Sequence, residues 1–497
     1  GMVKRNEKSL PYILAAIEQL EKNGDTFFND KQLFDAYRQE NTQLTSEQYQ
    51  WDKSTLIRKK LLHLEGGRIY LERTWNYEVA VTNYLADILS NNVTKGVALP
   101  DPLTCGDVTL SSQQRGAIAT ALSSRLSMIL GSAGSGKTTL IQAMVKKAPF
   151  PAYTVVTAAP TGRAARNLTE RTGIQARTIH SALGKIPDEN FLDPVCWEYV
   201  HLVVIDEASM VSLEMLAGIL DRVSTDCRVV LLGDPNQLLA VGAGNILSDL
   251  RELGVPITYL EQQYRQSESA KALRYNVVEF PNLHDISEFR WDDSFRLIPA
   301  SDAEIAKIVC REAAKRYLAG ERVQVLSMTN HKTAFSAADL NRGIQDLVNP
   351  LAKGALTWGN FRNGDRIIVL KNNSEQDLSN GDVGLLQLWE NTAILPLGHR
   401  AGIWNTEYPP KDLALAYALT VHKSQGSQYD TVILPVSTAT SKMLYRNLLY
   451  TAISRAKKQV ILVGSKEALH VAMQVTPRPR RSMLVPRTRM LLFRRSA

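Results

Sequence analysis

Residues 126–139 constrain the fold of this chain more than any other stretch. The apolar run LSMIL leads directly into GSAGSGKTT, and the continuation TTLIQAMVKK has the pattern of a helix. Glycines let backbone N–H groups turn inward around phosphate oxygens, and a helix N-terminus adds partial positive charge. The complete order of strand, loop and helix predicts a phosphate-binding loop and disfavours a glycine-rich turn without a ligand. The expected nucleotide contacts are Gly131, Ser132, Ala133, Gly134, Ser135, Gly136, Lys137, Thr138 and Thr139.

A pair of carboxylates ends another apolar strand. In VVIDEASM the strand runs into Asp206 and Glu207. We expect Lys137 to meet the β- and γ-phosphates of ATP, and Thr138 and Asp206 to hold Mg²⁺ directly or through water. Glu207 is expected to deprotonate the water that attacks the γ-phosphate. A bare Asp-Glu pair is usually a solvated strand end, but the buried strand before this pair favours catalysis.

A further apolar strand, RVVLLGD, leads into GDPNQL. This order predicts that the amide of Gln237 senses the γ-phosphate or its attacking water. The alternative is a simple turn built from Asp234, Pro235 and Asn236.

Two polar segments follow strands without being needed to hold a nucleotide. AAPTGRAA contains Pro160 and Thr161, and ARTIHSAL contains Thr178 and His180. Hydroxyl, imidazole and guanidinium groups at the ends of strands or helices can contact a phosphodiester backbone without reading bases. These segments therefore predict a nucleic-acid surface, although a lone histidine such as His180 is more often packed in a core.

Short apolar runs separated by helical stretches indicate two α/β units in tandem. The first set comprises RLSMIL, YTVVTAA, HLVVIDE and RVVLLGD, and the second comprises RVQVLSM, DRIIVL, DTVILPV and QVILVG. Continuous apolar strands are typical of parallel sheets buried on both faces. We place the first unit at 101–255 and the second at 256–381 with 412–470. A small helical or winged-helix-like module is expected at 1–100.

Composition narrows the functional classes. The 497 residues carry a formal net charge of +8, which is compatible with a polyanionic partner without requiring one. Cys105, Cys196, Cys227 and Cys310 lie far apart and form no Cys-x-x-Cys pair, which argues against a zinc site or a disulfide framework and favours the cytoplasm. Neither a signal peptide nor an apolar run of about 18 residues is evident, so no membrane partner is expected.

The order of these segments resembles that of the superfamily 1 helicase motifs. The matching stretches are LSSQQ, GSAGSGKT, APTGRAA, TIH, VVIDEAS, GDPNQL, QQYRQS, LTVHKSQGSQYD and LLYTAISRAKKQVILVG. Their spelling is similar to the RecD-like branch, which includes RecD and TraA-type proteins. The resemblance implies two RecA-like domains and an ATP-driven translocase. It further implies movement from 5′ to 3′ on single-stranded DNA and unwinding of duplex that bears a 5′ overhang.

The same resemblance implies contacts that the residues alone do not. Gly426 would lie near the nucleotide, and Gln114 would read adenine, where the alternative is an exposed helix residue. Gln428 stands where the family commonly carries Glu, so the contact at that position loses its carboxylate charge. The residues implied to touch the DNA backbone are Thr420, His422, Ser424 and Gln425.

Two arginines of the second unit, Arg265 in QYRQ and Arg455 in AISRA, are expected to reach the nucleotide. A guanidinium group stabilises charge on the transferring phosphoryl group, and supplying it from another lobe couples hydrolysis to lobe closure. Each arginine taken singly is more commonly a surface ion-pair partner.

Family likeness also suggests a small SH3-like β insertion at 382–411. Its Trp389 and Trp404 are expected in the core of the insertion more than stacked on bases. Residues 185–201 occupy the place of a duplex-splitting hairpin, but the sequence shows no such wedge. The arginine-rich residues 471–497 are expected to form a tail that either follows phosphates or is solvated.

Two function classes remain open. The chain is either a helicase by itself or the DNA-stimulated ATPase subunit of a larger recombination or repair nuclease complex. A P-loop enzyme that acts on a small phosphate acceptor lacks support, because a kinase does not need a second lobe that bears arginines. No nuclease carboxylate cluster is evident, so we expect no intrinsic cutting of DNA.

Overall fold

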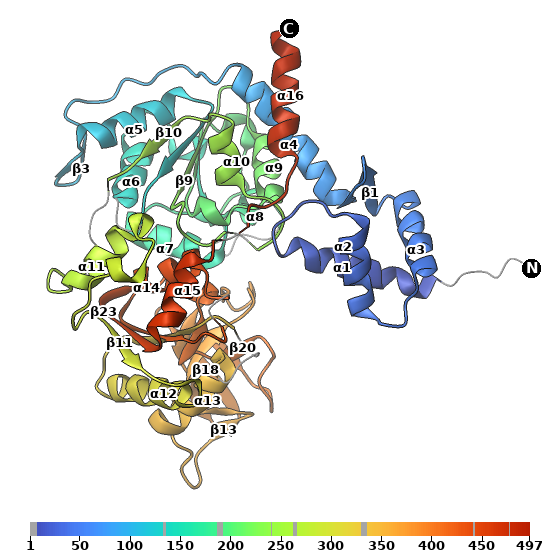
Figure 1. Cartoon of the computed structure of the whole chain (residues 1–497). Helices are drawn as coiled ribbons and strands as arrows, with labels where there is room; N and C mark the ends of the chain where they lie inside the picture. Colours follow the sequence, from blue (N-terminus) through green and yellow to red (C-terminus); the bar gives the residue numbers. More distant parts are fainter. Residues whose placement is uncertain are drawn as a thin grey trace, which may run out of the picture.

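Two parallel sheets, each covered by helices, form the body of the protein (Figure 1). The computed structural model describes residues 7–132, 136–185, 192–239, 241–261, 266–329, 335–440, 443–476 and 478–497. Figure 1 places the first α/β unit above the second, with a module of the first residues to one side. The prediction of two tandem α/β units is therefore confirmed.

The first sheet has the strand order β10-β5-β9-β8-β6-β7, and every neighbouring pair is parallel. The four predicted strands of this unit are present as β5, β6, β8 and β9. Their side chains are mostly apolar on both faces because helices cover both faces of the sheet. The strands are β5 (Leu126–Leu130), β6 (Val155–Ala159), β7 (Arg177–Thr178), β8 (Leu202–Ile205), β9 (Arg228–Gly233) and β10 (Ile257–Tyr259). The helices are α5 (Ser112–Ser123), α6 (Lys137–Lys147), α7 (Gly162–Thr172), α8 (Ile179–Ala182), α9 (Leu213–Arg222) and α10 (Ile246–Glu252).

The second sheet has the order β11-β23-β22-β12-β21 and is also parallel throughout. Its strands are β11 (Phe295–Pro299), β12 (Val323–Ser327), β21 (Ala418–Thr420), β22 (Tyr429–Val436) and β23 (Ala456–Gly464). Its helices are α11 (Lys271–Val278), α12 (Asp302–Leu318), α13 (Ala337–Val348), α14 (Arg446–Ser454) and α15 (Lys466–Gln474).

The predicted boundaries of the second unit need two corrections. The boundary at 255/256 is too early, because β10 pairs with β5 and so belongs to the first sheet. The run DRIIVL was expected in the second parallel sheet, but its strand β15 (Arg366–Val369) pairs antiparallel with two short strands outside that sheet. Both errors arise because an apolar run identifies a buried strand without identifying its partner.

The β insertion is larger than the predicted 382–411. It spans residues 357–415, here called the β module, and two three-stranded sheets in it share one apolar core. Its strands are β13 (Thr357–Trp358), β14 (Phe361–Arg362), β15, β16 (Val383–Leu385), β17 (Gln387–Trp389), β18 (Thr392–Leu397), β19 (Arg400–Trp404) and β20 (Leu413–Leu415). The expectation for its tryptophans is half right: Trp404 packs against Trp358 with ring centroids 5.7 Å apart, whereas Trp389 is 63% exposed.

The first described residues form three helices and an antiparallel hairpin, followed by one long helix. The elements are α1 (Leu10–Glu21), α2 (Asp30–Glu40), α3 (Ser46–Arg58), β1 (Leu62–Glu65), β2 (Arg68–Leu71) and α4 (Glu72–Ser90). Val81, Leu85 and Ile88 of α4 lie in the core of the first α/β unit, so α4 joins this N-terminal module to that unit.

The C-terminal residues are not the free tail that was expected. After α15, residues 484–496 form α16 (Leu484–Ser496), which packs along α4. The guanidinium of Arg487 donates to Glu65 and to the buried Glu78. Two carboxylates therefore neutralise an arginine that composition alone left free to meet phosphates.

Residues 185–201, which occupy the place of the duplex-splitting hairpin of relatives, lie partly outside the described residues. Residues 186–191 are not described, and Lys185 forms an ion pair with Glu214 at 2.8 Å. Trp197–Tyr199 form a short 3₁₀ helix. Within the described ranges no helix combines the length and apolarity that crossing a bilayer requires.

Candidate nucleotide site and nucleic-acid cleft

A glycine joins the phosphate-binding loop to α6 in a backbone conformation that favours a residue without a side chain. Gly136 has φ 85° and ψ 17°, a left-handed conformation that costs other residues free energy, and Lys137 is the first residue of the helix. Residues 133–135, predicted to contact the nucleotide, lie outside the described residues. The described part of the loop has the strand, turn and helix order on which the prediction rested.

Asp206 follows the end of β8, beside the phosphate-binding loop. Its backbone N–H donates to the carbonyl of Ala158 at 3.0 Å, which continues the pairing of β8 with β6. Burial and the adjacent Glu207 raise the pKa of Asp206, while the charge of Lys137 lowers it. Glu207 itself has φ 54° and ψ 44°, an uncommon conformation for a residue with a side chain. Strain of this kind concentrates at functional sites, and the catalytic role of Glu207 stays a prediction.

Asp234 follows β9 and is 4% exposed. It accepts hydrogen bonds from the backbone of Asn236 at 2.9 Å and from the amide of Gln237 at 3.4 Å. It also accepts one from the hydroxyl of Tyr450 on α14, at 3.1 Å. Burial raises the pKa of Asp234, and the charge of Lys137 opposes that shift. Asp234 is thus more than a turn residue, because it ties the two α/β units together.

Gln237 is buried and contacts the second unit as well. Its amide oxygen accepts from the hydroxyl of Thr451 at 3.3 Å. Tyr450 and Thr451 were not predicted. The signal for both was their place in LLYTAIS, directly before the predicted Arg455.

Arg455 lies between α14 and β23 and is 5% exposed. Its guanidinium donates to the carbonyls of Thr451 and Ser427, at 3.3 Å and 3.4 Å. Burial lowers its pKa, and the negative charges of Glu207 and Asp234 raise it. The structure therefore brings Arg455 to the carboxylates of the first unit, as a residue acting across the two units requires. Arg265 lies outside the described residues.

The donor set at the loop fits magnesium bound with phosphates. Thr138 follows Lys137 at the start of α6, and the carboxylate of Asp206 lies within reach of the charge of Lys137. Hydroxyl and carboxylate oxygens are hard ligands, and Mg²⁺ in such sites takes one or two protein oxygens and completes its shell with phosphate and water.

Gln114 lies at the N-terminus of α5, where it completes a capping box with Ser111. Its side-chain amide oxygen accepts from the backbone N–H of Ser111 at 2.9 Å, and its backbone N–H donates to the Ser111 hydroxyl at 3.2 Å. The predicted contact with adenine would therefore fall to the remaining N–H₂ group of the amide.

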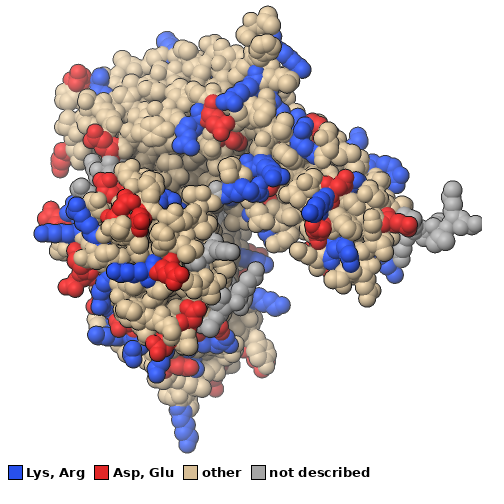
Figure 2. Space-filling model, in the orientation of Figure 1, with Lys and Arg blue, Asp and Glu red and all other residues tan. Residues whose placement is uncertain are grey.

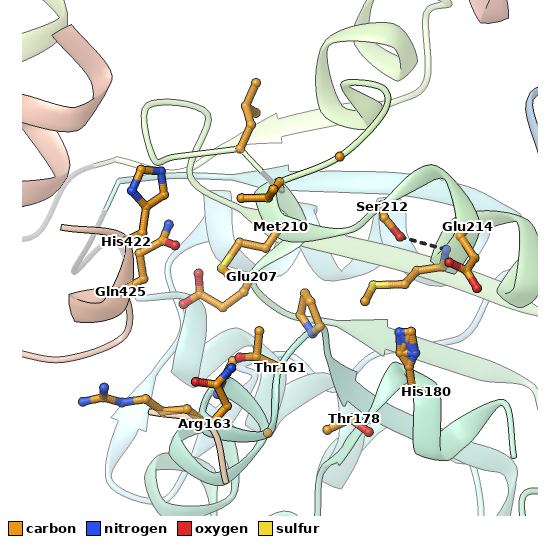
Figure 3. A pocket seen from close by; sticks show the side chains of 18 of the residues that line it. Thr161, Arg163, Thr178, His180, Glu207, Met210, Ser212, Glu214, His422 and Gln425 are labelled. Atoms are coloured by element: carbon orange, nitrogen blue, oxygen red, sulfur yellow. Dashed lines mark hydrogen bonds between the residues drawn. The ribbon is translucent and has the colours of Figure 1, made fainter. Parts of the chain in front are cut away.

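A cleft of about 970 Å³ lies between the two units, with the N-terminal module at one end; we call it the interdomain cleft. Figure 3 shows His422 and Gln425 of the second unit facing Glu207 and Thr161 of the first across this space. Six of the eight residues predicted to touch DNA line the cleft: Pro160, Thr161, Thr178, His180, His422 and Gln425.

The other two predicted DNA contacts have local roles. Ser424 is fully buried, and its hydroxyl donates to the carbonyl of Val421 at 2.6 Å. The hydroxyl of Thr420 accepts from the backbone of Lys423 at 3.3 Å, at the start of the 3₁₀ turn His422–Ser424. Both hydroxyls shape the turn that presents His422, and neither residue lines the cleft.

Gly426, which the family resemblance places near the nucleotide, lines the interdomain cleft together with Glu207. Its carbonyl accepts from the amide of Asn167 at 3.0 Å. Next to it, Arg163 donates to the carbonyls of Gly381 and Lys423, at 3.0 Å and 3.4 Å. Arg163 and Asn167 were not predicted individually. Their signal was the segment APTGRAARN, which begins α7.

Two protein families match this chain. Residues 109–279 match the AAA domain family, and residues 415–463 match the UvrD-like helicase C-terminal domain family. The first match spans the phosphate-binding loop and indicates a nucleotide-using domain. The second spans the segment that contains His422, Gln425 and Arg455.

Relatives of known name match over most of the chain. The ATP-dependent RecD2 DNA helicase of Deinococcus radiodurans is 30% identical over 453 residues, which cover 88% of this chain and 61% of that protein. The RecBCD enzyme subunit RecD of Mycolicibacterium smegmatis is 29% identical over 455 residues, which cover 83% of this chain and 81% of that subunit. The chain thus spans about three-fifths of the length of the first of these relatives.

Solved structures resemble the chain more loosely. Bacteroides Pif1 bound to single-stranded DNA is 22% identical over 73% of this chain and 94% of that chain, with a TM-score of 0.41.

Proposed function

We propose that the chain is a RecD-like superfamily 1 helicase and thus an ATP-driven motor acting on DNA. In this proposal it moves from 5′ to 3′ along single-stranded DNA and unwinds duplex that bears a 5′ overhang. The direction is carried over from the family, because two lobes that close and relax can ratchet either way. A cytoplasmic location also remains a prediction.

One observation carries the motor function: Glu207 belongs to both halves of the site. It lines the interdomain cleft together with His422 and Gln425, and its charge acts on the buried Arg455. A residue in this position can transmit the binding of a ligand in the cleft to the hydrolysis reaction at the phosphates. Coupling of that kind is what converts hydrolysis into movement.

The proposed chemistry assigns one role to each residue. Thr138 and Asp206 would hold Mg²⁺, which supplies positive charge to the phosphate oxygens when it is bound. Lys137 binds the same phosphates, and Glu207 accepts the proton of the attacking water. Arg455 stabilises the charge on the departing phosphoryl group from the second unit. Arg265 is proposed to assist in the same way.

The proposed binding of nucleic acid does not require contacts with the bases. Hydroxyl, imidazole and amide groups from both units line the interdomain cleft, and such groups bind the phosphodiester backbone of any sequence. We therefore propose single-stranded DNA as the occupant of the cleft, with weak sequence preference and marked dependence on salt.

Two assays test the proposal. The rate of ATP hydrolysis is measured with and without single-stranded DNA, and an unstimulated rate would contradict a DNA motor. Unwinding is then compared on two substrates at matched salt, one with a 5′ and one with a 3′ overhang. Preference for the 3′ tail would contradict the proposed direction.

A second candidate is supported by the RecBCD subunit named above, of which this chain covers 81%. In this alternative the chain is the DNA-stimulated ATPase of a larger recombination or repair assembly. DNA-stimulated hydrolysis without unwinding of either tailed substrate by the purified chain would favour it over the motor acting alone.

A further inference from the structure

A second pocket, of about 470 Å³, lies between α7 and the second unit; we call it the α7 pocket. It shares Arg163, Gly381 and Gly426 with the interdomain cleft, so the two are neighbours separated by contacts of α7. None of Lys137, Asp206, Glu207, Gln237 and Arg455 lines it. Its polar wall comprises Arg163, Arg322, Arg366, Ser427, Gln428 and Tyr429.

The α7 pocket carries an excess of positive charge. Five arginines line it, against the acids Glu170 and Asp382. Ion pairs engage two of the arginines: Arg166 with Asp377 at 2.9 Å, and Arg400 with Asp382 at 2.9 Å.

The other three arginines form no ion pair with a carboxylate among the described residues, and they bond only to neutral oxygens. Arg163 donates to backbone carbonyls. Arg322 donates to the carbonyl of Gln428 at 3.4 Å, and Arg366 donates to the side-chain oxygen of Gln324 at 3.2 Å. The remaining acid of the pocket, Glu170, also forms no ion pair among the described residues, so three unpaired arginines stand against one unpaired carboxylate.

Four buried polar atoms of the same wall have no hydrogen-bond partner among the described residues. They are Nε of Arg366, Oγ of Ser427, Nε2 of Gln428 and the hydroxyl of Tyr429. Ser427 is 8% exposed and Tyr429 is 5% exposed, so bulk water has little access to them. Buried polar groups are nearly always bonded, and four unsatisfied groups in one wall indicate a missing partner with several acceptor atoms.

We propose that the α7 pocket binds a phosphate group. A phosphate oxyanion carries the negative charge that three arginines lack, and its oxygens accept from the same N–H and O–H groups that are unsatisfied. Gln428 stands where the family commonly carries Glu, and its side-chain amide can donate a hydrogen bond to the anion. A carboxylate at this position would repel it.

Two sources can supply this group. The pocket borders the interdomain cleft, so a backbone phosphate of the proposed DNA strand is the first. The pocket also borders Arg455, which donates to the carbonyl of Ser427 at 3.4 Å. Inorganic phosphate released by hydrolysis is therefore the second source, and this second source rests on the proposed function.

Direct binding tests the proposal in two arms. In the first, inorganic phosphate is titrated calorimetrically into the full chain, with the phosphate-binding loop filled by a non-hydrolysable ATP analogue and Mg²⁺. In the second, the affinity for a fluorescent single-stranded oligonucleotide is measured. Both arms compare the parent with Gln428→Glu, which keeps the side-chain shape, and with Arg322→Gln, which alters an exposed residue. Arg311→Gln, an exposed arginine on α12, removes the same charge at a distance and is the matched control.

We expect Gln428→Glu and Arg322→Gln to weaken binding about tenfold in at least one arm, with Arg311→Gln unchanged. Loss in the phosphate arm alone identifies free phosphate as the source, and loss in the oligonucleotide arm identifies DNA. Unchanged affinity in both arms overturns the proposal, as does an equal loss in Arg311→Gln. Binding of the ATP analogue is read in its own titration, so failure of the nucleotide site is seen separately.

Discussion

The hydroxyl of Tyr450, on α14 of the second unit, donates a hydrogen bond of 3.1 Å to the carboxylate of Asp234, which follows β9 of the first. Both residues are buried, and the ring of Tyr450 packs on Phe280 with centroids 5.2 Å apart. Through this bond a change at the end of β9 reaches the helix that ends at Arg455. The contact therefore joins the second unit to the end of β9, beside the proposed nucleotide site.

Tyr450→Phe removes this bond while keeping the packed ring. We expect the DNA-stimulated rate of ATP hydrolysis to fall about two- to tenfold, because one net hydrogen bond contributes about 0.5–1.5 kcal/mol. Tyr153→Phe, at a tyrosine that is 72% exposed, is the control. Equal rates in the parent and Tyr450→Phe would show that the bond has no part in coupling.

Lys137→Ala and Glu207→Gln separate phosphate binding from proton transfer. Lys137→Ala is expected to abolish hydrolysis but to leave nucleotide-free DNA binding, since the proposed DNA contacts lie across both units. Glu207→Gln is expected to retain Mg-ATP and to lower turnover by about 10²–10⁴-fold. Nucleotide binding and turnover are measured on the same samples, and parent-like turnover in Glu207→Gln would refute its role as base.

Arg455→Lys keeps a positive charge but loses the planar fork. The rate of hydrolysis should fall by about 10³-fold, with a much smaller change in ATP affinity, because the guanidinium acts on charge that develops in the transition state. Arg455 is buried, so thermal unfolding is measured in parallel to confirm that the variant is folded. A variant altered only in ATP affinity would make Arg455 a ground-state binder.

The double variant His422→Ala with Gln425→Ala removes two side chains from one wall of the interdomain cleft. DNA-stimulated hydrolysis should fall and any basal rate should persist, since neither residue is assigned to the phosphates. His399→Ala, on an exposed turn of the β module, serves as control. If DNA binding by the double variant kept the parent's affinity and salt dependence, the cleft would not be the DNA path.

Glu21 predicts a pH dependence of stability. Burial raises its pKa from 4.5 to about 7, and the hydroxyl of Thr74 donates to its carboxyl group. Because the folded pKa is above the unfolded one, folding favours the protonated carboxyl. Its contribution is full below pH 4.5 and is lost as the pH rises toward 7.

The free energy of unfolding of the parent relative to Glu21→Gln should therefore fall by up to about 3 kcal/mol across that window. Denaturant unfolding at a series of pH values measures it. Glu40→Gln, at an exposed residue of α2, is the control. A difference between parent and Glu21→Gln that does not vary with pH would contradict the assigned pKa.

The residues proposed to bind the nucleotide could be predicted from the sequence because each follows an apolar run that can be recognised in the sequence by itself. Lys137, Asp206 and Gln237 each follow a buried parallel strand of the first sheet, and the carboxyl ends of such strands meet at one edge. Periodicity therefore places them together before any tertiary contact is known. The same holds for the apolar runs that form β5, β6, β8, β9, β12, β22 and β23, since such runs bounded by turns identify buried strands, whereas β7, β10, β11 and β21 were not predicted.

Contacts between distant segments were decided only by the tertiary structure. The sequence allows a simple turn at Asp234, but its carboxylate accepts a hydrogen bond from Tyr450 of the second unit. The family resemblance implies a DNA contact at Ser424, but its hydroxyl donates to the carbonyl of Val421. The arginines of residues 471–497 read as a free basic tail, yet Arg487 is neutralised by Glu65 and Glu78. The composition gives the number of charged side chains but not their ion pairs. The tertiary structure therefore decides which cationic side chains are free to bind a phosphate. By that measure Arg322 and Arg366 remain available and Arg487 does not.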